Sequence, residues 1–123
     1  MRIIVSTERR KLARDPQELA QLLVARANVG DVDGMVELYE PDAVLAIGGD
    51  KIARGTAQIR AFYANFLATG VRFNVGEQRP AMLSGELALT STRLPNGTIT
   101  AEVARRQSDG SWRWVIDQPA ITQ

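Results

Sequence analysis

Residues 55–67 of the chain, GTAQIRAFYANFL, carry the pattern that decides the fold. Thr56 is a residue type that caps helices. The apolar residues after it recur at i, i+3, i+4, i+7 and i+8, the spacing of one helix face: Ile59, Phe62, Tyr63, Phe66 and Leu67. Gly70 is of the type that ends helices. The segment therefore predicts an amphipathic helix that buries one stripe against the rest of the protein.

Two further helices are predicted upstream. In the first, Asp15 is a capping residue, Pro16 suits the first helical position and Glu18 stands three residues after the cap. An apolar face follows at helical spacing, comprising Leu19, Leu22, Leu23 and Ala27.

Residues 28–43, NVGDVDGMVELYEPDA, predict the end of that helix, a tight turn and a short second helix that runs into a strand. Gly30 is placed to end the first helix and Asp31 to begin the second. Pro41 is expected to close the second helix, whose inward residues would be Met35, Val36, Leu38 and Tyr39.

The rest of the chain predicts strands. The apolar run 43–47 ends at Gly48-Gly49, and 51–54 is expected to pair back against it. From Val71 onward the period changes to alternation. The tight-turn sequences Pro95-Asn96-Gly97 and Asp109-Gly110-Ser111 divide this half into strands near 71–79, 83–94, 98–107 and 112–118. Helices followed by a meander of strands predict an α+β fold.

Composition limits the chemistry. The 123 residues are 45% hydrophobic and 24% charged, as in an ordinary globular domain, and they include no cysteine and no histidine. A thiol nucleophile, a thiolate metal site and a histidine general base are therefore all excluded. We expect no cofactor and no metal.

Charge is uneven along the chain. Residues 1–14 hold five basic residues and one acidic residue, a net charge of +4 in a chain whose total is +1. We interpret 1–14 as a basic N-terminal arm, in which Ile3-Ile4-Val5 can pair as an edge strand, and 15–123 as a single domain. No basic face or aromatic platform elsewhere supports nucleic-acid binding. No apolar run approaches the ~20 residues of a membrane span, so we expect a cytoplasmic protein without a membrane partner.

The motif Gly55-Thr56-x-x-Ile59-Arg60-x-Phe62-Tyr63-Ala64-Asn65 resembles the ketosteroid isomerase pattern almost residue for residue. Gly30-Asp31-Val32-Asp33-Gly34 and Asp42-Ala43 match two further motifs of that group. Over residues 16–117 the chain is similar to the nuclear transport factor 2-like superfamily, in its SnoaL-like and ketosteroid isomerase-like branch. The resemblance implies a cone-shaped, curved and mainly antiparallel sheet packed on three N-terminal helices with a central pocket, in a protein that forms homodimers through the sheet.

The resemblance also indicates which catalytic groups are missing. The isomerase uses an aspartate base and an oxyanion hole made of a tyrosine and a protonated aspartic acid. These positions fall on Ile47, Leu23 and Ala104, or on Arg106 in place of Ala104 if the Asn96-Gly97 turn sets the alignment. Isoleucine cannot abstract a proton, and leucine and alanine cannot stabilise an oxyanion. Isomerase chemistry by that mechanism is therefore not expected.

Asp117 is the first candidate for other chemistry. By resemblance it matches a pocket-lining position, on the face that it would share with Val115 and Arg113, and superfamily relatives use aspartates as acid or base. Apolar walls would raise the pKa of its carboxyl group. The alternative is an aspartate that ends a strand and is satisfied locally or faces water.

Glu102 is the second candidate, and two arguments about it conflict. The strand parity inferred from the resemblance points it into the pocket. The alternation of Ile99, Ala101 and Val103 instead predicts that these apolar residues face the core. Trp112 and Trp114 share one face of the last strand, where packing or a dimer contact is the simpler interpretation than stacking on a ligand.

Two functions remain open. The first is a binder of a small apolar or polycyclic molecule that lacks the isomerase residues. The second is a SnoaL-like cyclase, isomerase or hydratase that uses Asp117, helped by Glu102, as general acid or base. The residues expected to contact the ligand are Leu23, Ile47, Phe62, Phe66, Ala104, Val115 and Asp117. The expected partners are this ligand and a second copy of the chain.

Overall fold

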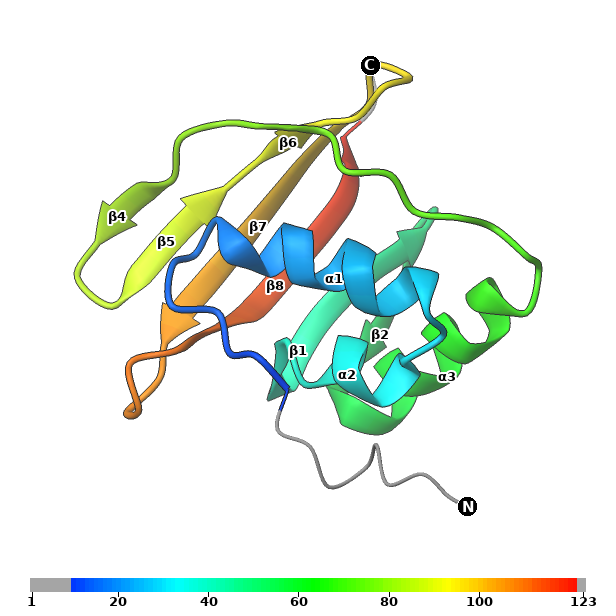
Figure 1. Cartoon of the computed structure of the whole chain (residues 1–123), viewed down its shortest axis with the longest axis horizontal. Helices are drawn as coiled ribbons and strands as arrows, with labels where there is room; N and C mark the ends of the chain where they lie inside the picture. The colour runs from blue at the N-terminus through cyan, green and yellow to red at the C-terminus, as the bar shows by residue number, and fades with distance from the viewer. Residues whose placement is uncertain (1–9, 122–123) are drawn as a thin grey trace.

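The computed structural model describes residues 10–121, in which three helices combine with one sheet of eight strands (Figure 1). The helices are α1 (Glu18–Asn28), α2 (Val32–Val36) and α3 (Gly55–Leu67). The strands are β1 (Tyr39–Gly48), β2 (Lys51–Arg54), β3 (Glu77–Gln78), β4 (Met82–Ser84), β5 (Leu87–Thr90), β6 (Thr92–Arg93), β7 (Ile99–Arg106) and β8 (Trp112–Ile121).

The sheet is open, curved and mixed. Its main path runs β2-β1-β8-β7-β5-β4, and the short pair β3–β6 joins it at β7. β1 and β8 are parallel, and every other strand pair is antiparallel. The prediction of a curved, mainly antiparallel sheet packed on three helices is confirmed, but the sheet does not close into a barrel.

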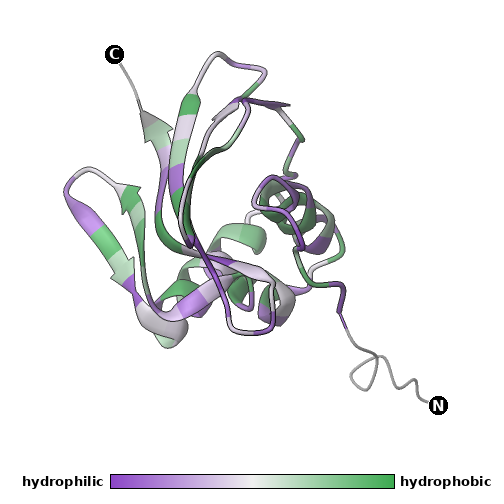
Figure 2. Cartoon of the chain, turned by 90° about the vertical axis from the view of Figure 1, so that its left-hand side faces the viewer, coloured by the Kyte–Doolittle hydropathy of each residue, from purple (hydrophilic) through white to green (hydrophobic). Residues whose placement is uncertain are grey.

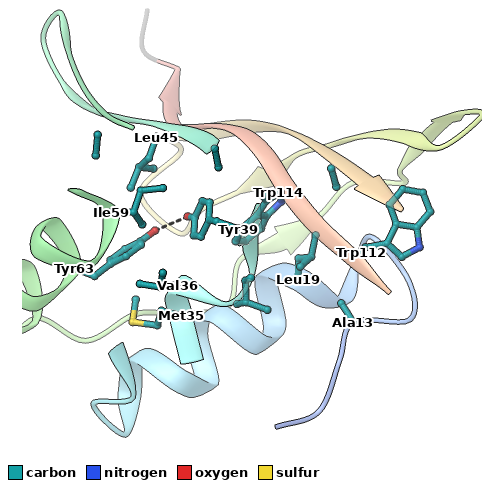
Figure 3. Packing of buried hydrophobic residues seen from close by; sticks show 14 of the residues in the cluster. Ala13, Leu19, Met35, Val36, Tyr39, Leu45, Ile59, Tyr63, Trp112 and Trp114 are labelled. Atoms are coloured by element: carbon teal, nitrogen blue, oxygen red, sulfur yellow. Dashed lines mark hydrogen bonds between the residues drawn. The ribbon is translucent and has the colours of Figure 1, made fainter. Parts of the chain in front are cut away.

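The helices lie on one side of the sheet, and in the side view of Figure 2 α1 is seen nearly end-on beside the curved strands. Leu19 from α1, Ile59 from α3 and Leu45 from β1 are almost completely buried between the two layers (Figure 3). Each such side chain contributes about 1.5–3 kcal/mol on burial. This core holds the helices at a fixed separation from the strands.

α1 begins two residues later than predicted, at Glu18 rather than at Pro16. Residues 15–18 form a turn in which the Glu18 amide donates to the Asp15 carbonyl at 3.0 Å. The Glu18 carboxylate accepts from the Arg14 amide at 2.8 Å, and the N-cap residue Gln17 makes no side-chain cap. The acid of the predicted capping box thus reaches back past Asp15 and stabilises the turn before the helix.

α2 begins as predicted, because the Asp31 side chain accepts from the Gly34 amide at 3.0 Å. It ends earlier than predicted, since Tyr39 already belongs to β1. Pro41 lies inside β1, where the pairing with β8 is interrupted between Tyr39 and Val44. A proline has no N–H for the ladder, so it fits this irregular stretch.

α3 matches its predicted range, but Thr56 is not its cap. The N-cap residue is Arg54, whose amide donates to the Gln58 side chain at 2.8 Å. Gly55 has φ +83°, a conformation that favours glycine and lets the chain turn directly from β2 into the helix.

The predicted strands of the second half are partly correct. The turns at Asn96-Gly97 and Asp109-Gly110 are confirmed: the Gly97 and Gly110 amides donate to Leu94 and Gln107 carbonyls at 2.8 and 2.9 Å. The predicted strand 83–94 is wrong, because a turn at Gly85 and a break at Ser91 divide it among β4, β5 and β6. Most of the predicted strand 71–79 is irregular, and only Glu77–Gln78 pairs.

Part of the basic arm packs onto the domain. The Trp112 amide donates to the Ala13 carbonyl at 2.9 Å, and Ala13 is 2% exposed. The buried guanidinium of Arg26 donates to the Lys11 carbonyl and, at 2.8 Å, to the Gly34 carbonyl. Residues 10–14 are thus tied to both α1 and α2. The predicted edge strand at Ile3-Ile4-Val5 lies outside the described residues.

Candidate functional site

A cavity of about 230 Å³ lies between α1, α3 and the inner face of the sheet. Its walls are mostly apolar and aromatic. The apolar lining comprises Ala20, Leu23, Val24, Leu45, Phe62, Phe66, Phe73, Val75, Leu94, Trp114 and Pro119. α1 and α3 each present one helical face to it, and the irregular segment 73–76 covers one side.

Polar groups enter the cavity from the strands. The register pairs Leu45 with Asp117, Asp117 with Glu102 and Glu102 with Thr90, so that these residues form one row across β1, β8, β7 and β5. Asp117 is 5% exposed and Glu102 is 7% exposed, and both line the cavity. Two carboxyl groups on adjacent strands therefore meet in a largely apolar space.

Asp117 faces inward because β8 is irregular. Val103 pairs with Ile116 whereas Ala104 pairs with Trp114, which leaves Val115 as an extra residue on β8. Such a β-bulge changes the parity of the strand. Trp114 and Asp117 consequently lie on the same inner face although they are three residues apart.

Two tyrosines connect to the Asp117 carboxyl group. The Tyr39 hydroxyl donates to Asp117 Oδ2 at 2.5 Å and lies 2.6 Å from the Tyr63 hydroxyl. With Asp117 ionised, the single proton of Tyr39 goes to the carboxylate, so Tyr63 donates to Tyr39. Figure 3 shows the two phenols pointing toward one another, from β1 and α3. They fix one oxygen of Asp117 and leave Oδ1 without a donor among the described side chains.

Glu102 has its own partner. Thr90 Oγ1 donates to Glu102 Oε1 at 2.5 Å across β5 and β7. Burial raises the pKa of Glu102, and hydrogen bonds from Thr100 and Thr90 oppose that rise. The group is thus held in place by neutral donors rather than by a cation.

Burial also raises the pKa of Asp117, to about 7. The neighbouring Glu102 adds to the shift and the hydrogen bond from Tyr39 opposes it. The pKa of each tyrosine is raised as well, mainly by burial. A carboxyl group that titrates near neutral pH can both accept and donate a proton.

The structure places the sequence-predicted site residues in two groups. Leu23, Phe62, Phe66, Glu102 and Asp117 line the cavity. The lining does not include Ile47, Ala104 and Val115.

The placement of Ile47, Ala104 and Val115 in the cavity is therefore corrected. Ala104 is completely buried in the core, and Val115 is the bulge residue. On β1 the cavity is reached by Leu45, two residues before Ile47, and on β7 it is reached by Thr100 and by Glu102, which stands two residues before Ala104. The open question of strand parity on β7 is resolved in the same way, because Thr100 and Glu102 point inward while Ile99, Ala101 and Val103 face outward and are half-buried.

Sequence reasoning missed Tyr39 and Tyr63 as partners of Asp117. They are the only two tyrosines in the chain, and the apolar patterns around them assigned both to the core. Their hydroxyl groups need partners when buried, and this requirement was the available signal. Nothing in the sequence indicated that the same carboxyl group would supply the partner.

A second depression is polar and is lined in part by residues of α2 and α3. Its lining includes Arg10, Asp33, Glu37, Arg60 and Arg113. Most of these charges are paired with one another. Arg10 Nη1 lies 2.6 Å from Glu37 Oε2, and Arg60 Nε lies 2.9 Å from Asp33 Oδ1. Exposed pairs of this kind contribute little energy. We therefore place the candidate site in the apolar cavity.

Within residues 10–121, no helix combines the length and the apolar character that crossing a bilayer requires. The same residues contain no group of three or more acidic side chains placed to hold a metal ion.

The fold is that of cystatin-like, nuclear transport factor 2-like α+β domains. Residues 20–122 match the SnoaL-like domain family, and the chain belongs to that family.

Solved structures with little sequence identity share the fold. A Thiobacillus denitrificans protein, provisionally named as a calcium/calmodulin-dependent protein kinase type II association domain, is 14% identical (TM-score 0.75; 93% of this chain and 100% of that chain covered). A ketosteroid isomerase-like protein from Erwinia carotovora atroseptica is 20% identical (0.65; 87% and 94%). A nuclear transport factor 2-like protein with a cystatin-like fold from Novosphingobium aromaticivorans is 23% identical (0.61; 86% and 79%). At these identities the likeness concerns the fold alone.

Proposed function

We propose that the protein binds a small, mainly apolar molecule in the cavity between α1, α3 and the sheet. The observation that carries this proposal is an internal space walled by aromatic and aliphatic side chains, with two hydrogen-bonding carboxyl groups at one place on its surface. Apolar walls supply affinity and a few polar groups orient the ligand, which is the usual construction of a ligand site.

The volume limits the size of the ligand. Cavities for drug-sized ligands measure roughly 300–1,000 Å³, and this cavity measures about 230 Å³. A molecule of one or two rings fits that space better than a steroid or a polycyclic aromatic. The cavity volume thus narrows the class of ligand from the small apolar or polycyclic molecule expected from the sequence to molecules of one or two rings.

A matched pair of α1 variants tests the site. Ala20 lines the cavity, and Ala25 is exposed on the same helix. Ala20→Trp fills the space that a ligand would take, whereas Ala25→Trp adds the same side chain to the surface. We expect a neutral two-ring probe such as 2-naphthylmethanol to stabilise the wild type by about 2.7 kcal/mol at a hundred times its Kd.

The thermal shift should persist in Ala25→Trp and disappear in Ala20→Trp, with circular dichroism showing that both variants are folded. An equal shift in the two variants would place the probe elsewhere and contradict the proposal.

A second candidate function is acid–base catalysis at the same site, with Asp117 as the group that moves the proton. The observation that favours it is a carboxyl group whose pKa is raised by burial to about 7 and whose position is fixed by Tyr39. In this mechanism the Asp117 carboxylate takes a proton from a carbon beside a carbonyl group and returns it at another position. Glu102, in its protonated form, can donate a hydrogen bond to the developing oxyanion.

Proton exchange tests this function without a known substrate. We would incubate 2-tetralone, a two-ring ketone, with the protein in heavy water and follow loss of the α-proton signals by NMR. Catalysis by Asp117 predicts exchange above the buffer rate that rises with pH through about 7 and is lost in Asp117→Asn. Exchange equal to that of buffer, for a ketone shown to bind, would leave the protein as a binder only.

A further inference from the structure

Among the described residues that line the cavity, two are acidic and none is lysine or arginine. The two acids are Glu102 and Asp117. Their hydrogen-bond donors are neutral hydroxyl groups, of Thr90 and Thr100 to Glu102 and of Tyr39 to Asp117. The electrostatic character of this space is therefore that of an acceptor for positive charge, and an anionic ligand would be repelled by either carboxyl group in its ionised form.

The walls beside these acids are aromatic. Phe62 and Phe66 stack with ring centroids 5.6 Å apart, and Phe73 meets Phe66 edge-on at 5.7 Å. All three line the cavity together with Trp114. Aromatic faces attract cations, more strongly where water is excluded. Flat apolar walls also accommodate the ring system of a ligand.

Resting on the proposed ligand-binding function, we infer that the ligand class is a hydrophobic amine. Its ammonium group lies beside Asp117 Oδ1 and the Glu102 carboxyl group, and its one- or two-ring body lies along Phe62, Phe66 and Phe73. The ammonium supplies the counter-charge that these two carboxyl groups lack. It also supplies a hydrogen-bond donor to Asp117 Oδ1, to which no described side chain donates.

Proton release accompanies this binding. The groups that face Asp117 are Glu102 on β7, Tyr39 on β1 and Tyr63 on α3, and none of them is a cation. Below pH about 7 the Asp117 carboxyl group is mostly protonated, so the ammonium must displace a proton. Affinity for the amine should rise about tenfold per pH unit up to that value and level off above it.

A series of three probes with one ring system separates charge from shape. 2-Naphthylmethylamine is cationic, 2-naphthylmethanol is neutral and 2-naphthoic acid is anionic at pH 7.5. By isothermal titration calorimetry we expect the amine to bind at least tenfold more tightly than the alcohol, and the acid to bind most weakly. Asp117→Asn should remove the preference for the amine. Asp50→Asn, which changes the net charge equally in the exposed turn between β1 and β2, should retain it.

The outcomes are distinguishable. Equal affinity for the alcohol and the amine, tighter binding of the acid, or a preference that survives Asp117→Asn would overturn the charge inference and leave a neutral ligand site. No binding of any probe to a folded wild type would overturn the proposed function and the inference together.

Discussion

Asp117 and Glu102 are carboxyl groups buried on neighbouring strands, and no lysine or arginine among residues 10–121 lines their cavity. Desolvation of a charged group is costly, so each acid favours its neutral form and its pKa rises. A protein that only needed a core would gain stability from apolar residues here. Their presence in a cavity is thus more readily explained by a ligand than by stability.

The stability of the protein should depend on pH through Asp117. The pKa of the group is about 7 in the folded chain and near 3.8 when unfolded, so the folded state binds more protons between these values. Stability therefore falls as pH rises from 4 to 7, by roughly 4 kcal/mol at most for a shift of this size. We expect Asp117→Asn to be more stable than the wild type at pH 8.

At pH 4 the two proteins should be similar, because the wild-type carboxyl group is then neutral. Urea denaturation at both pH values measures the difference. An Asp117→Asn variant that is less stable than the wild type at pH 8 would argue against a desolvated carboxylate.

Tyr39 should act on the Asp117 carboxyl group directly. Its hydroxyl lowers the pKa of Asp117 by donating to Oδ2, so Tyr39→Phe should raise that pKa above 7 and cost about 1–3 kcal/mol of stability. Carboxyl ¹³C NMR titration follows the pKa. Tyr63→Phe is the matched control, because Tyr63 reaches Asp117 only through Tyr39 and should shift that pKa less. Equal shifts in both variants would refute the proposed order of the hydrogen bonds.

At the scale of single residues, the sequence predicts which face of an element a side chain lies on better than it predicts which side chains that residue contacts. The apolar spacing of α3 was sufficient to place Phe62 and Phe66, because a helical face follows from the period alone. Tyr39 was missed because its role depends on β1 and β8 lying side by side in parallel. The hydrogen bond between Tyr39 and Asp117 that this pairing allows joins residues 78 positions apart, and no local pattern encodes it.

Among the elements, β8 shows how a single residue controls the site. Its bulge at Val115 places both Trp114 and Asp117 on the inner face. Simple alternation predicts the two on opposite faces, and this is why Val115 was wrongly assigned to the cavity. Bulges depend on the fit between two strands, so they cannot be predicted from one strand's pattern.

The start of α2 offers a test of local packing. A Cβ added to Gly34 would lie 2.2 Å from Asp31 Oδ2, and Asp31 both caps the helix and pairs with Arg10 at 2.8 Å. We expect Gly34→Ala to cost about 1–3 kcal/mol by displacing this carboxylate.

In the Asp31→Ala background the same substitution meets no carboxylate. There it should be neutral or should stabilise by up to about 1 kcal/mol, since alanine favours helix more than glycine does. Chemical denaturation of the wild type, the two single variants and the double variant measures the coupling free energy between the two substitutions. Additive effects would show that the clash with Asp31 is not the cause.

The whole molecule presents an apolar outer sheet face opposite the cavity. The row behind the carboxyl groups pairs Met82 with Leu89, Leu89 with Val103, and Val103 with Ile116. Met82, Leu89 and Ile116 are between 45% and 68% exposed. We propose that a second copy of the chain covers this face.

Light scattering after size exclusion tests this assembly. At 50 µM we expect the mass of a dimer for the wild type and of a monomer for Ile116→Asp, because a buried unpaired carboxylate would be costly. Val29→Asp, at a residue 79% exposed beyond the end of α1, should remain dimeric. A monomeric wild type, or a dimer that persists in Ile116→Asp, would exclude this face as the interface.

The fold class and the buried faces of the helices were predictable because the periodicity of apolar residues and the turn residues determine them locally. The openness of the sheet and the cavity volume were not, because both depend on how far the strands curve. The position of the ligand therefore needs direct observation.

The measurement that tests the account most directly is an amide ¹H–¹⁵N NMR titration of the protein with 2-naphthylmethanol. We predict that the largest shifts belong to cavity residues on three different elements, namely Ala20 on α1, Phe66 on α3 and Glu102 on β7. Shifts confined to the outer row of Leu89, Val103 and Ile116, or the absence of any saturable shift, would contradict a ligand site in this cavity.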